Sequence, residues 1–111
     1  MRFEENRIGD VLVLKVLDSR IAADVAPLFK AHLIGYLEQG ERSVVLDLAA
    51  VSFIDSSGLG ALISTLKALG SDGKLVITGA RGTVASLFKL TRMDKVLRLF
   101  GTNEEGLAAI P

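Results

Sequence analysis

The chain alternates short apolar runs with segments of helical periodicity, and this alternation constrains its fold more than any other feature. The runs are rich in Val, Leu and Ile, as expected of strands buried in a sheet. A polar segment before the Gly9-Asp10 turn is expected to pair across that turn with the first apolar run. The segments that we interpret as strands are residues 2–7, 11–17, 43–48, 74–80 and 95–100.

Two of the intervening segments carry long apolar stripes typical of amphipathic helices. Pro27 favours a start of the first helix near Ala26, and Gly40 is a plausible end. Gly70 is expected to end the second helix. The predicted stripes are Val25, Leu28, Phe29, Leu33, Tyr36 and Leu37 in the first helix, and Leu59, Leu62, Ile63, Leu66 and Leu69 in the second.

Two shorter helices are predicted in the last third of the chain. Thr83 is expected to cap a helix with the stripe Val84, Leu87, Phe88 and Thr91. Thr102 and Glu105 have the spacing of a capping box for a final helix. The sequence therefore predicts an α/β fold, in which a mixed, mostly parallel sheet of four to five strands carries four helices within a single domain, residues 1–111.

Composition narrows the class of protein. Thirteen basic residues balance thirteen acidic ones, so nothing in the net charge favours nucleic acid or an anionic membrane. The absence of cysteine excludes disulfides, thiolate metal sites and a cysteine nucleophile. No apolar run approaches the roughly 20 residues that cross a bilayer, and residues 1–10 are too polar for a signal peptide. We expect a cytoplasmic protein that contacts neither nucleic acid nor membrane and holds no metal or cofactor.

The tetrapeptide Asp55-Ser56-Ser57-Gly58 joins a predicted strand to the second helix. Asp and Ser are preferred helix caps, so a purely structural role is one interpretation. Neighbouring glycines resemble a dinucleotide loop, but Ile63 replaces the third glycine. A nucleophile elbow would need glycine two residues before the serine, and His32, the single histidine, lies on another helix. These patterns indicate that the protein is not an enzyme.

Asp47 ends a predicted strand and invites comparison with the acidic site of phospho-acceptor receiver domains. The chain is too short for their five strands and five helices. We therefore expect the Asp47 carboxylate to bond neighbouring loop amides.

The stretch "VVLDLAAVSFIDSSGLGALISTLKAL" closely resembles the signature of STAS domains, in particular anti-sigma factor antagonists (anti-anti-sigma factors). In that family, a strand ends in a D-S-S-G or D-S-T-G loop at the start of the second helix. "LDSRIAADVAPLFKAHL" and "GKLVITGARGTVASLFKLTRMDKVLRLF" are similar to the first-helix region and the closing half of these proteins. The resemblance covers essentially the whole chain.

The resemblance implies a partner switch in transcription regulation. The unmodified protein would bind an anti-sigma factor, a serine kinase of the histidine-kinase-like ATPase type, and phosphorylation of Ser56 would release it. A serine phosphatase would reset the protein. The partner is expected to dock around the loop and the start of the first helix; the residues concerned are Asp55, Ser57, Gly58, Leu59, Gly60, Arg20 and Asp24. The resemblance also places Asp47 near this loop.

One position departs from the family pattern. Many members have an acidic residue where this chain has Ala22, although Asp18 and Asp24 are close in sequence. Two other functions remain open: a STAS subunit of a larger assembly, such as a transporter or a stress-sensing complex, and a STAS module that binds a nucleotide without a phospho-switch.

Overall fold

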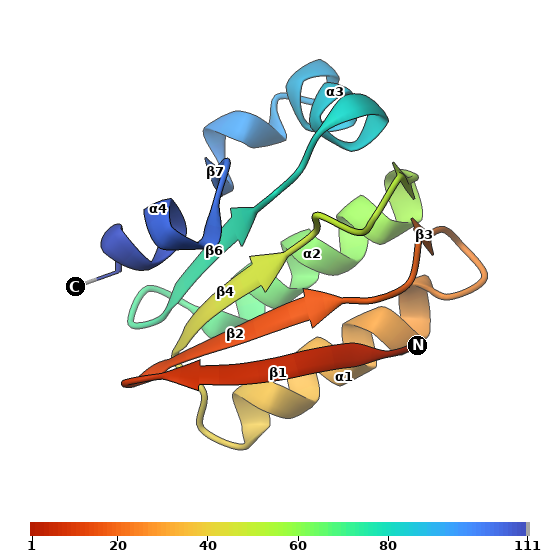
Figure 1. The fold of residues 1–111 in the computed structure, drawn as a ribbon. Coiled ribbons are helices and arrows are strands. Elements are labelled where there is room, and N and C mark those ends of the chain that lie inside the picture. Colours follow the sequence, from red (N-terminus) through yellow and green to blue (C-terminus); the bar gives the residue numbers. More distant parts are fainter. Residues whose placement is uncertain (111) are drawn as a thin grey trace.

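The predicted strands form one five-stranded sheet in the order β1-β2-β4-β6-β7 (Figure 1). The computed structural model describes residues 1–110. β1 is antiparallel to β2, and every other neighbouring pair is parallel. The strands of this sheet are β1 (Phe3–Ile8), β2 (Val11–Val16), β4 (Ser43–Asp47), β6 (Lys74–Thr78) and β7 (Arg98–Phe100).

Residues 1–110 also form four α-helices, each joining or following strands of the sheet. The predicted α/β fold, with its mostly parallel sheet and four helices, is therefore confirmed. The Thr102–Glu105 capping box is present as predicted. The helices are α1 (Ala26–Glu38), α2 (Ser56–Leu69), α3 (Gly82–Leu90) and α4 (Asn103–Ala108), with a short 3-10 helix η1 (Met93–Lys95) after α3.

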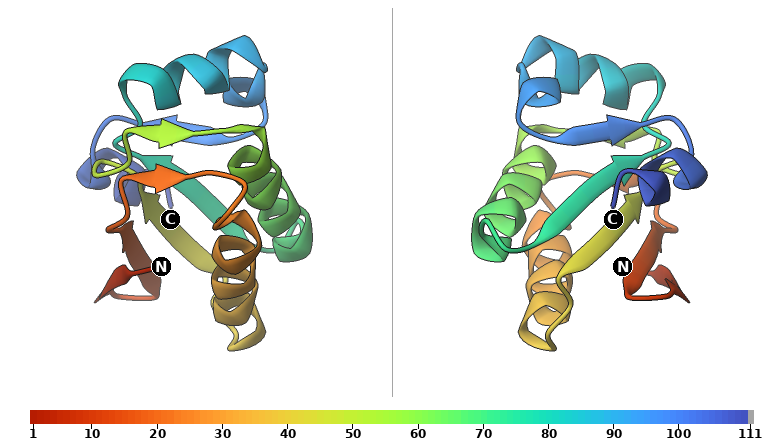
Figure 2. Two further views of the ribbon diagram at one scale, coloured as in Figure 1. Left: turned by 90° about the vertical axis from the view of Figure 1, so that its right-hand side faces the viewer. Right: turned by 90° about the vertical axis from the view of Figure 1, so that its left-hand side faces the viewer.

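Alternate side chains of the central strands enter two separate cores, because successive residues of a strand point to opposite faces. Val13, Val45 and Val76 are neighbours in register and pack with Ile110 beside α4. On each strand, the residues on either side of these valines point to the opposite face and form the larger core with the apolar faces of α1, α2 and α3. Figure 2 shows α1 and α2 side by side on one side of the sheet, with α4 on the other. Burial on both faces explains the nearly continuous apolar runs.

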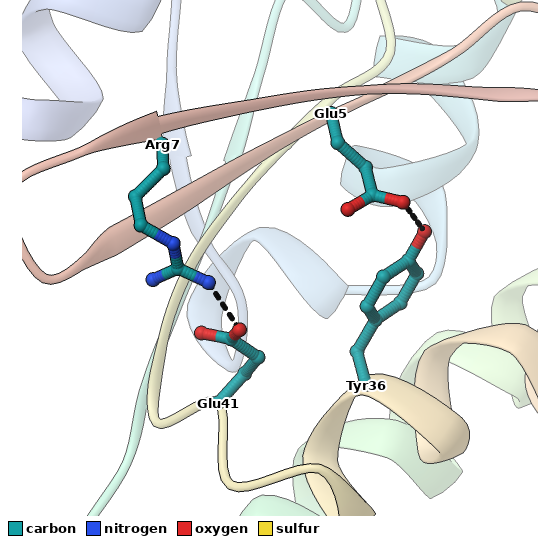
Figure 3. A network of polar contacts seen from close by, with 4 residues as sticks. All are labelled: Glu5, Arg7, Tyr36 and Glu41. Carbon is teal, nitrogen blue, oxygen red and sulfur yellow. Dashed lines mark hydrogen bonds and ion pairs between the residues drawn. The ribbon is translucent and has the colours of Figure 1, made fainter.

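Polar contacts tie the edge strand β1 to α1 and to the turn that follows it (Figure 3). The Tyr36 hydroxyl donates to Glu5 at 2.8 Å, and Arg7 forms an ion pair with Glu41. The ring of Phe3, the first residue of β1, packs against α1, with its centroid 5.2 Å from that of His32. His32 therefore packs against an aromatic ring on an exposed face of α1.

Two very short strands are not predicted from the sequence. β3 (Arg20–Ile21) and β5 (Phe53–Ile54) pair in parallel as a separate two-stranded sheet. Each contains two residues, too few for any periodicity to be recognised. This ribbon places the segment before α1 directly beside the segment before α2.

Four local predictions are wrong. Thr83 does not cap α3, because the N-cap is Arg81 and the Thr83 hydroxyl instead donates to the Ser52 carbonyl. The predicted stripe of α1 includes Leu28, but 47% of this residue is exposed. The predicted stripe of α3 includes Thr91, but this residue is the C-cap of the helix and is exposed. β7 begins at Arg98 rather than Lys95, since residues 93–95 form the 3-10 helix.

Candidate functional site

Asp55 caps the N-terminus of α2. Its backbone is extended, with φ −108° and ψ −175°, and its Oδ1 accepts a hydrogen bond from the Gly58 amide at 3.0 Å. This bond satisfies one of the backbone amides left free in the first helical turn. The sequence left open which residue of the tetrapeptide makes the cap, and the structure assigns this role to the carboxylate rather than to a serine.

The same carboxylate reaches across to the segment before α1. Its Oδ2 accepts a hydrogen bond from the Ala23 amide at 3.0 Å. The pKa of Asp55 is lowered chiefly by the hydrogen bond from the Gly58 amide; burial opposes this effect, and the Ala23 amide adds to it. Asp55 is therefore a fixed negative charge that holds the two segments together.

Ser56 and Ser57 are the first two residues of α2, and both are exposed. Because Asp55 makes the cap, the fold does not need either hydroxyl for that purpose. The helix that follows has 14 residues, so its N-terminus carries the partial positive charge of a full helix dipole. The Ser56 hydroxyl is thus open to solvent at a helix end that favours an anion.

Gly58 and Leu59 pack the start of α2 against the rest of the protein. A Cβ on Gly58 would lie 2.6 Å from the Ile21 carbonyl oxygen and 2.7 Å from Ile54 Cγ1, so only glycine fits against the β3–β5 ribbon. Leu59 is 7% exposed and belongs to the large core. Both residues are buried in this structure and position the serines, and their contact with a partner stays a prediction.

Gly60 lies on the outer face of α2, where a Cβ would meet nothing within 4 Å. It lines an open groove of about 440 Å³ between α1 and α2. Ser57 belongs to the same groove, so the predicted contact residues Ser57 and Gly60 share one surface. The groove is lined by Ala23, Ala26, Pro27, Lys30, Ser57, Gly60, Ala61 and Ser64.

Arg20 and Asp24 lie on the segment before α1, and both are exposed. Arg20 is the register partner of Phe53, and its guanidinium carbon lies 5.4 Å from the centroid of the Phe53 ring. This distance is within the range of a cation–π interaction. The ribbon thus presents Arg20 and Phe53 just before the capping residue of α2.

The position where the family often has an acid is buried in this chain. Ala22 is 7% exposed, and its carbonyl accepts hydrogen bonds from the Val25 and Ala26 amides at the start of α1. Asp18 accepts a hydrogen bond from the Arg2 amide, and it therefore fastens the start of the chain. Asp24 is the nearby acid that faces solvent.

Asp47 belongs to a different hydrogen-bond network from the serine loop. Its Oδ1 accepts from the Ala49 amide at 2.9 Å, as predicted for a strand-end acid, and its Oδ2 accepts from the Asn103 side-chain amide at 2.9 Å. Asn103 also accepts a hydrogen bond from Thr78. These bonds fix α4 to the sheet.

Sequence reasoning missed three participants in the site: the Ala23 amide, the Phe53 ring and the Thr83 hydroxyl. The bond from Thr83 to the Ser52 carbonyl, at 2.6 Å, ties α3 to the turn that leads into β5. All three depend on the pairing of β3 with β5, which leaves no periodic signal. The D-S-S-G tetrapeptide was the available local signal, and it located the cap.

In the described part of the chain, no three His, Cys, Asp or Glu side chains gather in a way that could hold a metal ion. No helix within residues 1–110 has the length and apolarity required to cross a membrane.

The fold and the capped serine loop define a small α/β domain with a mixed five-stranded sheet. The STAS domain family matches residues 2–106. The chain belongs to the STAS domain family.

Individual relatives agree with this assignment. The anti-sigma-B factor antagonist of Staphylococcus epidermidis is 34% identical over 74 residues, which are 66% of this chain and 68% of the relative. The crystal structure of an anti-sigma factor antagonist from Mycobacterium paratuberculosis superposes with a TM-score of 0.88 at 27% identity, covering 98% of this chain and 92% of the other. The phosphorylated form of the Bacillus cell fate determinant SpoIIAA has the same fold, with a TM-score of 0.71 at 17% identity, covering 99% of this chain and all of that one.

Proposed function

We propose that this protein is an anti-sigma factor antagonist whose partner binding is controlled by phosphorylation of Ser56. Its unmodified form binds an anti-sigma factor that is also a serine kinase of the histidine-kinase-like ATPase type. Phosphorylation releases the complex, and a serine phosphatase restores the binding form. The protein acts by binding and does not itself catalyse a reaction.

The observation that carries this proposal is that Asp55, and not Ser56, caps the second helix. Asp55 caps α2 through Gly58, while Ser56 stands exposed at the first position of the helix. A phosphate on Ser56 would lie where the helix dipole and free amides favour an anion. The fold is therefore expected to survive modification, because the cap remains in place.

The charge of the phosphate explains how a local change can release a partner. Phosphorylation adds about −1.5 to −2 charges at neutral pH. The new charge would stand beside the carboxylate of Asp55, which is ionised at neutral pH and whose pKa is lowered by its backbone hydrogen bonds. Burying such a charge without a counter-ion costs on the order of 3–5 kcal/mol. At about 1.4 kcal/mol for each tenfold change, affinity falls by roughly two to three and a half orders of magnitude.

The docking surface proposed for the unmodified protein is the exposed part of the site. It comprises Ser56, Ser57 and Gly60 on α2, with Arg20 and Asp24 on the segment before α1. Ser57 and Gly60 of this surface line the groove between α1 and α2. The names of the relatives support an anti-sigma factor as the partner.

A nucleotide-binding role is disfavoured by the same geometry. The Asp55 carboxylate already occupies the Gly58 amide at the start of α2. A free phosphate group lacks the covalent bond that would hold a phosphate of Ser56 at this helix end against the negative charge of Asp55. Calorimetric titration with ATP and GTP is expected to give no heat of binding.

The experiment that tests the proposal uses the anti-sigma factor kinase encoded in the same genome, with ATP, followed by mapping of the phosphate by mass spectrometry. Phosphate is expected on Ser56, and none on the Ser56→Ala variant. Ser57→Ala is the matched control and should still be modified. Labelling confined to Ser57, or equal kinase affinity of the modified and unmodified proteins, would contradict the proposal.

A further inference from the structure

A second surface lies at the opposite end of α3 from the serine loop. The side chain of Leu90, the last residue of α3, is 82% exposed, and Val96, just after η1, is 51% exposed. No large apolar side chain in residues 1–110 is more exposed than Leu90. The two aliphatic residues stand among exposed cations, and we call this group the Leu90 patch: Lys89, Leu90, Arg92, Lys95 and Val96.

Consecutive hydrogen-bonded turns hold the patch together. The Arg92 amide donates to the Lys89 carbonyl, and the Lys95 amide donates to the Arg92 carbonyl. The Val96 amide then donates to Met93. These bonds keep the three cations and two aliphatic side chains on one short, continuous segment.

Arg92 holds its place at a conformational cost. With φ 61° and ψ 20°, it is the one non-glycine residue with positive φ in the described chain. Such a backbone favours glycine or asparagine, because a Cβ crowds the following carbonyl. The bend between α3 and η1 nevertheless carries a long cationic side chain next to Leu90.

The charge of the patch is local. The protein as a whole is neutral, yet residues 89–96 contain three cations and one acid, the half-buried Asp94. Within residues 1–110, the one ion pair joins Arg7 and Glu41, so Lys89, Arg92 and Lys95 have no carboxylate partner. Arg98 turns elsewhere, since it lies over the Phe100 ring and donates to the Ala109 carbonyl.

We propose that the Leu90 patch is a docking site for an acidic protein segment that carries an apolar side chain. Carboxylates would pair with the three cations, and the apolar side chain would cover Leu90 and Val96. Charge complementarity favours this occupant. A bilayer surface is disfavoured, because segments that lie in membrane interfaces typically contain Trp or Phe, and the patch has no aromatic residue.

This site extends beyond the proposed function. Thr83 contacts the serine-loop side at one end of α3, and Leu90 is seven residues further along the helix. At 1.5 Å per residue, the two ends are roughly 10 Å apart along the axis. The Leu90 patch is therefore a separate surface from the one proposed around Ser56.

The test measures binding of the full chain to a fluorescently labelled peptide in which Glu and Leu recur at helical spacing. Fluorescence anisotropy at low salt is expected to show saturable binding. Lys89→Glu/Lys95→Glu should weaken binding by about tenfold or more, and Leu90→Ser by about tenfold. The matched control is Arg42→Glu/Lys74→Glu, which makes the same charge change at exposed positions at the starts of β4 and β6. It should stay within about twofold of wild type.

Each other outcome overturns the proposal. Absence of peptide binding, wild-type affinity of Leu90→Ser, or an equal loss in the control variant would show that the patch is not a docking site. Vesicles of phosphatidylserine and phosphatidylcholine are tested in parallel by sedimentation. Patch-dependent binding to vesicles without binding to the peptide would assign the surface to a membrane. Thermal midpoints of all variants are measured to exclude unfolding.

Discussion

The Asp55 carboxylate accepts a hydrogen bond from the Ala23 amide at 3.0 Å, across 32 positions of the sequence. Its other oxygen caps α2 at Gly58. One side chain thus sets both the start of the second helix and its distance from the segment leading into the first.

Replacing Asp55 by alanine is expected to lower the thermal midpoint by roughly 5 °C, because the cap and the bond to Ala23 are lost together.

Comparison with Asp55→Asn should show how the contribution of the Asp55 charge to stability depends on pH. The pKa of Asp55 is lowered below 3.8, so its contribution to stability is fully present above about pH 4 and is lost as the pH falls through the folded-state pKa. The difference in midpoint between wild type and Asp55→Asn should shrink over that range in circular dichroism melts. A constant difference would contradict the assignment.

Two glycines of α2, two residues apart, should respond in opposite directions to alanine. Gly58→Ala places a Cβ 2.6 Å from the Ile21 carbonyl oxygen, and the strain is expected to destabilise the fold by about 1–3 kcal/mol. Gly60→Ala meets no atom within 4 Å and should stabilise the helix by about 0.5–1 kcal/mol. Urea denaturation of both variants checks the pair. Equal effects would show that the β3–β5 ribbon does not press on Gly58.

Ser56→Asp is expected to change the free energy of unfolding by less than about 1 kcal/mol, because an acid at the first helical position is favoured by the dipole. Affinity for the kinase should nevertheless fall markedly. Surface plasmon resonance against the kinase makes the comparison, with Ser56→Ala as the uncharged control. Wild-type affinity of the aspartate variant would show that charge at Ser56 is not the switch.

Gly60→Gln tests the groove between α1 and α2. The new side chain would fill part of the surface that Gly60 shares with Ser57, and kinase affinity should fall by about tenfold or more. Lys67→Gln lies on the exposed face of the same helix, outside the groove, and is the control. Thermal midpoints show whether either variant affects the fold. If both variants bind as tightly as wild type, the partner docks elsewhere.

Tyr36 offers a spectroscopic test of how β1 attaches to α1. Partial burial and the hydrogen bond to Glu5 raise the pKa of Tyr36 from 10.0 to about 12. The folded state therefore favours the neutral phenol, so stability is lost as the pH rises above about 10 towards 12. The chain has one tyrosine and no tryptophan, so near-ultraviolet absorbance reports Tyr36 alone. Glu5→Gln should lower the pKa; an unchanged titration curve would refute the contact.

The sequence predicts the sheet and the capping tetrapeptide because both leave local signals. Val45 and Leu46 lie in a continuous apolar run, and Asp55 precedes a regular helical stripe. The burial of Gly58 could not be predicted from local sequence, because it depends on the β3–β5 ribbon, whose paired residues are more than 30 positions apart. The prediction that Thr83 caps α3 is wrong for a related reason. The Thr83 hydroxyl donates to the Ser52 carbonyl, which lies near it only in the folded chain.

The pairing of β3 with β5 also bears on how the serine loop moves. The Ser52 amide donates to the Ser19 carbonyl and the Asp55 amide to the Ile21 carbonyl, so both flanks of the ribbon are bonded. Opening the loop alone would break these bonds together with the Asp55 cap. Amide hydrogens from Ser52 to Gly58 should therefore exchange with solvent as one cooperative unit with those near Ala23. A kinase that needs Ser56 in an extended conformation would have to supply the free energy of this concerted opening, whereas one that reads the serine on its helix would not.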